Sequence, residues 1–423
     1  MSVAIIWWGA AGLMCAATLL ESGYDQDIFL FDKNPHLGAK VIISWGGRCN
    51  VTTGFYKRQD LKSKFPNGRD FIQDALVGFG PRKIRAWFEE HGVPMKQEAD
   101  GRIFPVSNNG KDVVWAFEKL FSEYQNIYTK LKEKVETIEK IKDTHGAEKF
   151  LVTTNIESYI VDKVVITTWG NAYRHTGSNG DGYAFSQALW HSITDLGPSL
   201  TSFETEEKHF HELSGISFPN ARIVIKDGRK FDGPLLLTHF GITGPMVFAF
   251  SAFIPFQTVS KEEPLEIKWI PDSKINYDQR MELLQNGVSQ YSQKQINTFL
   301  KQYFPQRFVD LIIENYGLPP MQVMGKYTKE MFKIIAQTFG NWIPLHITGR
   351  RNGDEFVTSG WVPTSEINPE TMESLLCPGL YFGGEIMDVD GITGGYNLTS
   401  SWATGRLAGV SILKKANKVN FLV

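Results

Sequence analysis

The stretch VAIIWWGAAGLMCAATLLESGYDQDIFLFDKN, residues 3–34, decides the fold of this 423-residue chain. Its first apolar run, residues 3–6, predicts a buried strand, and residues 10–22 predict a helix that Gly23 ends. Residues 27–31 then predict a second strand. A strand, a helix and a strand in this order indicate the start of a βαβ unit and a parallel sheet.

The turn between the first strand and the helix holds part of a phosphate-binding pattern. In the pattern G-x-G-x-x-G, glycines permit a tight turn and the close approach of a pyrophosphate to a helix N-terminus. Gly9 and Gly12 supply the second and third glycines, whereas Trp7 stands at the first position. Asp32 follows at the spacing of a carboxylate that holds an adenosine ribose. The stretch therefore predicts a nucleotide cradle, which the indoles of Trp7 and Trp8 would obstruct.

Length and composition favour a globular protein of two or three domains that acts on a small-molecule substrate. The formal net charge is -2, which gives no reason to expect nucleic acid or a membrane as a partner; the oligomeric state is left open. Three cysteines without disulfide or zinc spacing indicate a cytoplasmic, reduced setting and no metal site. Small residues interrupt the uncharged residues 3–20 and no basic region precedes them, so we expect neither a transmembrane helix nor a signal peptide.

Changes in residue composition and pattern divide the chain into three parts. Residues 196–342 have short strands between Gly and Pro turns, followed by a helical, Gln-rich stretch over 278–339. We therefore expect a first domain over 1–195, an inserted module over 196–342, and a return to the first domain over 343–423. Other expected elements are helices over 70–91, 112–124 and 400–414, and strands over 147–154, 157–168, 223–225 and 235–238.

Five longer motifs carry a family resemblance. They are GAKVIISWGGRCNVTTG (38–54), GRIFPVS (101–107), TGSNGDGYAFSQALWHSIT (176–194), LTHFGITGP (237–245) and LYFGGEIMDVDGITGGYNLTSSWATGRLAG (380–409). In this order they resemble the BaiN-like, aminoacetone-oxidase-like family of NAD(P)/FAD-dependent flavoproteins over nearly the whole chain. The resemblance implies an α/β protein: a Rossmann-like, glutathione-reductase-type FAD-binding domain with an inserted β-barrel-like and helical module.

The resemblance also implies which residues bind the cofactor. The first turn and the second strand would hold the pyrophosphate and the adenosine ribose of FAD, and the loop near residue 45 would line the cleft. A helix N-terminus near residue 396 would favour a negatively charged flavin ring. The implied residues are Gly9, Ala10, Ala11, Gly12, Asp32, Lys33, Lys40, Ser44, Gly46, Gly47, Arg48, Cys49, Asn50, Val135, Thr168, Gly170, Gly384, Glu385, Asp388, Gly394, Gly395, Tyr396 and Asn397.

By this resemblance the chain would be an FAD-dependent oxidoreductase that acts on a small organic substrate. It has no second dinucleotide pattern, so NADH or NADPH would reduce the flavin in a brief visit; oxidation of a small amine or ketone by oxygen is the alternative. The candidate proton donors or acceptors are His239, Tyr396 and Cys49, for which a turn-stabilising or small buried role is the plain alternative. His209 and His211 lie among acids but lack a metal signature, and we interpret them as a solvated face.

Six tryptophans depart from the family pattern. The resemblance places glycine at each of these positions, and a buried indole there would overpack its surroundings at a cost of about 1–3 kcal/mol. Several such indoles around one cofactor would block FAD. The six are Trp7, Trp8, Trp45, Trp169, Trp190 and Trp361, whereas the tryptophans at 87, 115, 269, 342 and 402 stand at ordinary positions.

Three accounts of these tryptophans are open. The chain is a cofactor-free, catalytically inactive relative, or an engineered variant without cofactor, or the product of a misread gene. Some bacterial lineages read the UGA codon as glycine, whereas a widely used alternative code reads it as tryptophan. Misreading produces this substitution and no other, so we favour the third hypothesis. It predicts UGA at the six positions and UGG at the five ordinary ones.

Overall fold

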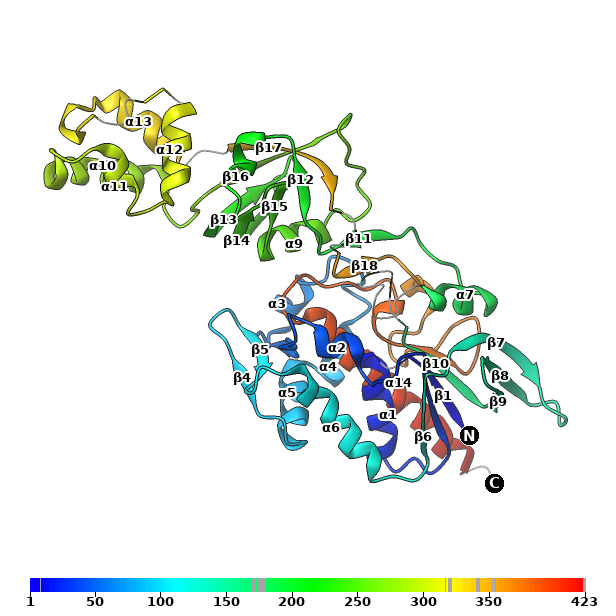
Figure 1. The fold of residues 1–423 in the computed structure, drawn as a ribbon. Helices are drawn as coiled ribbons and strands as arrows, with labels where there is room; N and C mark the ends of the chain where they lie inside the picture. The colour runs from blue at the N-terminus through cyan, green and yellow to red at the C-terminus, as the bar shows by residue number, and fades with distance from the viewer. Residues whose placement is uncertain are drawn as a thin grey trace. The chain divides into compact units, whose positions relative to one another are not determined.

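The computed structural model divides the chain into two compact units (Figure 1). The first unit comprises Met1–Ser199 and Glu355–Val423, and the second is Leu200–Asp354. Because the second unit interrupts the first, the chain passes between them twice. The structure describes residues 1–7, 9–168, 170, 172, 180–315, 317–318, 322–339, 343–351, 353 and 355–420.

The first unit is built on a parallel sheet. Its strand order is β19-β10-β1-β2-β6, and every neighbouring pair is parallel. The strands β1, β2, β10 and β19 are mostly apolar and buried, as expected of strands covered on both faces, whereas the edge strand β6 is partly exposed. Their carboxyl ends meet at one edge, which brings together the residues that follow them. The strands are β1 (Val3–Ile6), β2 (Ile28–Asp32), β6 (Ile127–Leu131), β10 (Lys163–Ile166) and β19 (Leu380–Phe382).

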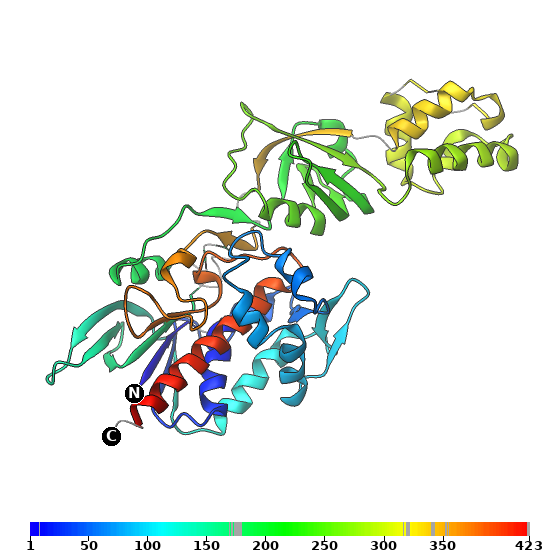
Figure 2. The ribbon, with the colours of Figure 1, turned by 180° about the vertical axis from the view of Figure 1, so that it is seen from behind.

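Two helices, α1 (Ala10–Glu21) and α14 (Tyr396–Asn420), pack beside each other in this unit (Figure 2). A Cβ on Gly405 would lie only 2.1 Å from the backbone oxygen of Ala11. The helices therefore approach as closely as glycine alone permits. This contact holds the start of α1 against the C-terminal part of the chain.

Shorter elements complete the first unit. They form two three-stranded sheets, β3-β5-β4 and β7-β8-β9, and the two-stranded sheet β11-β18. In the described part of the chain, no helix combines the length and the hydropathy needed to span a membrane. The elements are α2 (Ala39–Ile43), β3 (Thr52–Thr53), α3 (Arg58–Lys62), α4 (Gln73–Gly78), α5 (Pro81–Glu90), β4 (Met95–Gln97), β5 (Arg102–Pro105), α6 (Gly110–Ser122), β7 (Val135–Lys142), β8 (Glu148–Thr154), β9 (Ser158–Val161), α7 (Asp181–Ala188), β11 (Gly197–Ser199), β18 (Val357–Ser359), and the 3-10 turns η3 (Thr364–Glu366) and η4 (Gly384–Ile386).

The second unit combines a closed barrel with a helical part. The barrel order is β12-β15-β14-β13-β16-β17, and β17 closes on β12. Trp269 is fully buried in this unit and packs against Phe210, Phe218 and Phe308, so side chains fill its core. The elements are β12 (Phe203–Thr205), α8 (Lys208–His211), β13 (Ser217–Val224), β14 (Lys230–Leu237), β15 (Gly241–Thr243), α9 (Pro245–Ala252), β16 (Leu265–Ile270), α10 (Tyr277–Tyr291), α11 (Ile296–Leu300), α12 (Gln306–Asn315), η2 (Met324–Lys326), α13 (Lys329–Thr338) and β17 (Ile343–Arg350).

These two units confirm the predicted fold class, a Rossmann-like domain with an inserted barrel and helical module. The helix expected over 112–124 is α6 (Gly110–Ser122), and two other predicted helices depart further from their expected bounds. The helix expected over 70–91 is broken into α4 and α5, because Gly80 is extended and Pro81 starts a new first turn. The helix expected over 400–414 begins earlier, at Tyr396, directly after a glycine with positive φ, and runs on to Asn420.

Several predicted strands also have different bounds. The run 157–168 is divided at Asp162, which accepts a 2.7 Å hydrogen bond from the backbone N–H of Ser2. Its first half, β9, therefore pairs with β8, and its second half, β10, joins the parallel sheet. The strands expected over 223–225 and 235–238 overlap the ends of the longer β13 and β14, which stop one residue earlier, at Val224 and Leu237. A shift of register in their pairing interrupts the alternation by which sequence identifies a strand.

Candidate functional site

The residues that follow β1, β10 and β19 lie at the carboxyl edge of the parallel sheet. Gly9 is the N-cap of α1, so the free N–H groups of that helix start at this edge. A Cβ on Gly12 would lie 2.5 Å from the backbone oxygen of Trp7 and 2.7 Å from Thr167 Oγ1. Gly384, after β19, has a φ of 77°. Glycine is therefore required here, as in a cradle for a pyrophosphate.

Four tryptophans have the backbone conformation that favours glycine. The φ angle is 72° at Trp7, 53° at Trp45, 72° at Trp190 and 117° at Trp361. A residue with a Cβ is strained in this region by about 1–3 kcal/mol. Among the described residues, the tryptophans at ordinary positions, Trp87, Trp115, Trp269 and Trp402, do not have a positive φ. Trp8, Trp169 and Trp342 lie outside the described residues.

The reason for a positive φ is clearest at Trp190, because this residue ends helix α7. Its N–H donates to the carbonyl of Gln187 at 3.1 Å, and the N–H of His191 donates to the carbonyl of Ser186 at 2.9 Å. These two bonds form a Schellman motif, which closes a helix through one left-handed residue, most often glycine. The helix end thus suits glycine at position 190.

The indoles of Trp7 and Trp361 fill space near the carboxyl edge. Trp7 is 4% exposed, and Lys33 Nζ lies 4.2 Å from its ring centre. Trp361 is fully buried with its ring centre 3.9 Å from that of Tyr183, and a Cβ on Gly170 would lie 2.6 Å from its ring. Lys33 follows β2 and Gly170 follows β10, so both indoles lie beside residues that the resemblance implies for cofactor binding. Glycine at both positions would free this volume.

The end of β2 carries a polar cluster. Asp32 is buried, and its Oδ1 accepts the N–H of Asn34 at 2.7 Å. Lys33 forms a 3.0 Å ion pair with Asp181 at the start of α7. Asp32 and Lys33, two residues that the resemblance implies, therefore lie together at the end of β2, and their cofactor roles stay predictions. Asp181 joins them unpredicted, although the GDG sequence at the start of α7 was a signal for it. Val135 is buried at the start of β7, after the neighbouring strand β6.

The loop at residues 44–50 is tightly wound, with positive φ at Trp45, Gly46, Gly47 and Cys49. Arg48 pairs with Glu98 and donates to Asn108 Oδ1 at 2.8 Å, so protein acceptors occupy its guanidinium. Cys49 is fully buried, and burial raises the pKa of its thiol to about 12. At neutral pH it is therefore a protonated thiol, which gives no support to a nucleophilic or redox role.

The C-terminal segment from Gly384 to Asn397 joins the same site. Glu385 forms a 2.7 Å ion pair with Lys40, and both side chains are mostly buried. The side chain of Asn397 binds both backbone groups of Gly391 at 2.7 Å, which closes the turn before α14. The structure thus brings the two predicted halves of the site, near residues 40 and 390, into direct contact.

Buried polar atoms without a hydrogen-bond partner gather in this unit. In the part of the chain that the structure describes, they include both amide atoms of Asn50, the hydroxyls of Thr168 and Tyr183, and Oδ1 of Asp388. Burial raises the pKa of Asp388, and burial with the charge of Glu385 raises the pKa of Tyr183. Each such group costs about 1–3 kcal/mol unless a ligand satisfies it. They fit a ligand with many polar groups, as FAD has.

The three candidate acid–base residues lie in different surroundings. Tyr396 is buried at the start of α14, and burial raises its pKa. Cys49 is the neutral thiol described above. His239 belongs to the second unit and is exposed in a turn where Thr238 Oγ1 accepts the N–H of Gly241 at 3.1 Å. The acid–base roles stay predictions.

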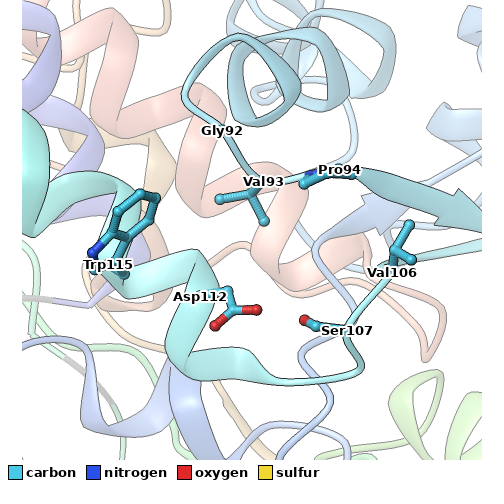
Figure 3. Close-up of a pocket in the computed structure, with 7 residues that line it drawn as sticks. All are labelled: Gly92, Val93, Pro94, Val106, Ser107, Asp112 and Trp115. Atoms are coloured by element: carbon cyan, nitrogen blue, oxygen red, sulfur yellow. The ribbon is translucent and has the colours of Figure 1, made fainter.

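One other candidate site is weaker. A hollow of about 480 Å³ is lined by Gly92, Val93, Pro94, Val106, Ser107, Asp112 and Trp115 (Figure 3). None of the residues implied by the resemblance lines it. Within the described residues, no three His, Cys, Asp or Glu side chains are grouped so as to hold a metal ion.

A parallel sheet whose first strand leads through a glycine turn into a helix, with an acid at the end of the second strand, defines a Rossmann-type dinucleotide-binding protein. The chain belongs to the family described as "HI0933-like protein Rossmann domain", which it matches over residues 1–411. This confirms the family resemblance drawn from the motifs. Membership supports FAD as the cofactor and FAD-dependent oxidoreductase as the general class.

Known relatives cover nearly the whole chain. A 3-dehydro-bile acid delta(4,6)-reductase of Clostridium scindens is 26% identical over 418 residues, which are 96% of this chain and 98% of the relative. A ribosomal RNA dihydrouridine synthase of Haemophilus influenzae is 30% identical over 418 residues, 97% of this chain and 98% of the relative. The crystal structure of 3-ketosteroid delta1-dehydrogenase from Sterolibacterium denitrificans has a TM-score of 0.51 at 11% identity and covers 98% of this chain and 99% of its own, a likeness of fold alone.

Proposed function

We propose that this protein, with glycine in place of its six unusual tryptophans, is an FAD-dependent reductase that saturates a C=C bond conjugated to a carbonyl group, with NADH or NADPH as the hydride source. The observation that supports FAD as the cofactor is the glycine cradle at the carboxyl edge, seen together with the unpartnered polar atoms of the same unit. These atoms belong to Asn50, Thr168, Tyr183 and Asp388.

The names of the two curated relatives support the reaction class. A delta(4,6)-reductase of a 3-dehydro bile acid saturates C=C bonds conjugated to the 3-oxo group. A dihydrouridine synthase saturates the C=C bond of uracil that is conjugated to a ring carbonyl. The reaction is of the same kind. A hydride adds to the end of the conjugated system, which is the β-carbon of an enone or the δ-carbon of a dienone, a proton adds to a carbon nearer the carbonyl, and one nicotinamide is oxidised for each bond saturated.

Bound FAD supplies the transfer of hydride between nicotinamide and substrate. The start of α1, with Gly9 and Gly12, would hold the diphosphate, because free N–H groups and glycine allow its close approach. Asp32 would accept hydrogen bonds from the adenosine ribose. Tyr396, His239 and Cys49 are the candidate proton donors, and burial keeps the thiol of Cys49 neutral. The cysteines are free and buried, which supports our placing of the protein in the cytoplasm.

The test compares the literal chain with a variant that has glycine at positions 7, 8, 45, 169, 190 and 361. We expect the variant to purify yellow with bound flavin and the literal chain to purify colourless. Anaerobic mixing of the variant with NADH or NADPH should bleach the flavin absorbance. A 3-oxo-4,6-diene and uridine in ribosomal RNA are then offered as oxidants, and mass spectrometry of the product identifies the substrate class. A variant that purifies colourless and does not bind added FAD contradicts the proposal.

The second candidate function is that of a cofactor-free binding module. The burial of the Trp7 and Trp361 indoles near the carboxyl edge favours it for the chain as written. Native protein with indole mass at these positions would support this candidate, and native protein with glycine mass there would exclude it.

A further inference from the structure

A carboxylate at the C-terminal side of the candidate site is bound by side chains from three distant segments. Asp390 is 1% exposed. Its Oδ2 accepts from Ser199 Oγ at 2.9 Å, and its Oδ1 accepts from Ser359 Oγ and from Asn67 Nδ2, each at 2.5 Å. Asn67 Nδ2 also donates to Ser359 Oγ at 2.7 Å. Three donors on one buried carboxylate indicate a built structural junction.

The two serines belong to the strands that flank the passages between the units. Ser199 ends β11 and is the last residue of the first unit before the inserted unit, and the chain returns at Glu355 shortly before β18. The two strands pair antiparallel, with Gly197 opposite Ser359. Asp390 therefore holds one hydroxyl from the departing strand and one from the returning strand. We call this pair of strands, residues 197–199 and 357–359, the crossing ribbon.

The crossing ribbon is also bound to the segment that we assign to the cofactor. The N–H of Thr358 donates to Glu385 Oε1 at 3.2 Å. The N–H of Asp388 donates to the carbonyl of Val362 at 2.9 Å, and the N–H of Val362 donates to the carbonyl of Ile386 at 3.1 Å. The segment 384–388 is therefore joined to the ribbon itself by the bond between Thr358 and Glu385, and to the residue three positions after the ribbon by the two backbone bonds of Val362.

We propose that Asp390 is a positioning residue: its carboxylate fixes the crossing ribbon and couples it to the cofactor segment. The chain would then leave the first unit at β11 and return to it at β18, and the carboxylate of Asp390 would fix both of these strands when the cofactor segment is ordered. The coupling rests on the proposed function, whereas the fixing of the ribbon does not. The charged group that faces Asp390 is Asp388, and burial raises the pKa of Asp390 to about 6. The three donors therefore hold a carboxylate that is ionised at neutral pH.

Hydrogen exchange of the full chain tests the fixing. We expect Asp390→Ala and Asp390→Asn to speed exchange in peptides that cover the crossing ribbon by about tenfold, because the bonds to a charged group are lost. The matched control is Asp162→Asn, which removes a carboxylate that binds Ser2 in the same unit. It should leave the ribbon unchanged and speed exchange near Ser2. Unchanged exchange in the ribbon of both Asp390 variants would overturn the proposal.

A second pair of variants guards against general loss of structure. Ser199→Ala removes one of the three donors and leaves the other two, so we expect it to fold and to speed exchange in the ribbon less than Asp390→Ala does. Ser199→Thr keeps the hydroxyl and should restore slow exchange. Faster exchange spread evenly over the first unit in both Ser199 variants would show a general packing role and overturn the proposal.

Exchange of the glycine-restored chain with and without FAD tests the coupling. We expect FAD to slow exchange in the ribbon, and Asp390→Ala to remove this effect while FAD stays bound. FAD that binds without slowing the ribbon would overturn the coupling. If FAD does not bind at all, the proposed function and the coupling fall together, and the fixing of the ribbon is judged by the first experiment alone.

Discussion

Helix α7 offers a direct measurement of whether the backbone at a tryptophan suits glycine. Trp190 is 60% exposed with a φ of 72°, whereas Trp115 is 47% exposed within helix α6. We compare the glycine variant with the alanine variant at each position. Both variants lose the whole indole, so the loss of its contacts lowers the unfolding free energy of each by the same amount. The difference between the two unfolding free energies then reports the preference of the backbone for glycine or alanine.

The two positions should differ in sign. At position 190, Trp190→Gly should be more stable than Trp190→Ala by about 1 kcal/mol, because a Cβ costs about 1–2 kcal/mol in the left-handed region and the unfolded-chain entropy of glycine offsets part of this. At position 115, Trp115→Ala should be more stable than Trp115→Gly by about 1 kcal/mol, because glycine is a poor residue within a helix.

Equilibrium unfolding in urea, followed by circular dichroism, measures both differences. With an m-value of about 3 kcal/mol per molar, each pair of variants should be separated by about 0.3 M in its midpoint. An alanine variant that is as stable as the glycine variant at position 190 would refute the reasoning, because that helix end would then tolerate a side chain. The pair at position 115 shows that the assay resolves a difference of this size.

Three further predictions follow from the first unit. Gly12→Ala should lower the unfolding free energy by about 1–3 kcal/mol, since its methyl group would lie 2.5 Å from a backbone oxygen, whereas Gly78→Ala, with open space around it, should not; urea midpoints decide this. A double variant that carries only Trp7→Gly and Trp361→Gly should have a higher affinity for FAD, measured by flavin fluorescence quenching, and equal affinity in the literal chain would contradict the role of the indoles. The pKa of Asp390 is raised to about 6, so the native state binds a proton that the unfolded state has lost between about pH 4 and 6. Its contribution to the unfolding free energy should therefore fall by about 3 kcal/mol as the pH rises through this window, and Asp390→Asn should flatten that part of the pH profile; identical pH profiles for both proteins would contradict it.

The start of the fold was predictable because its parts are neighbours in sequence. Residues 3–32 form a strand, a helix and a strand whose patterns are local, and the structure places β1, α1 and β2 within a residue or two of the prediction. The divided strand at Asp162 was not predictable. Its break depends on a hydrogen bond from Ser2, which lies 160 residues away in sequence.

The candidate site likewise has one part that local sequence patterns predict and one part that they do not. The cradle around Gly12 and the acid at Asp32 follow from spacing along one βαβ unit. The partners of Asp390 lie 31, 191 and 323 residues away, at Ser359, Ser199 and Asn67, so no local pattern marks their meeting. The motif DVDG contains Asp390, but sequence alone assigned only Asp388 to a role.

The backbone distribution of the tryptophans separates the three accounts of their origin. A positive φ is found at only a few per cent of non-glycine residues, yet four of the eight described tryptophans have one. Random decay of a cofactor site would place several residue types at these positions, and it would also place tryptophan where φ is ordinary. The family resemblance places glycine at each of the four with a positive φ, and it places no glycine at the other four described tryptophans. A change that affects glycine positions and yields tryptophan alone is what misread UGA codons produce, so the backbone supports glycine at these positions in the protein that works in the cell.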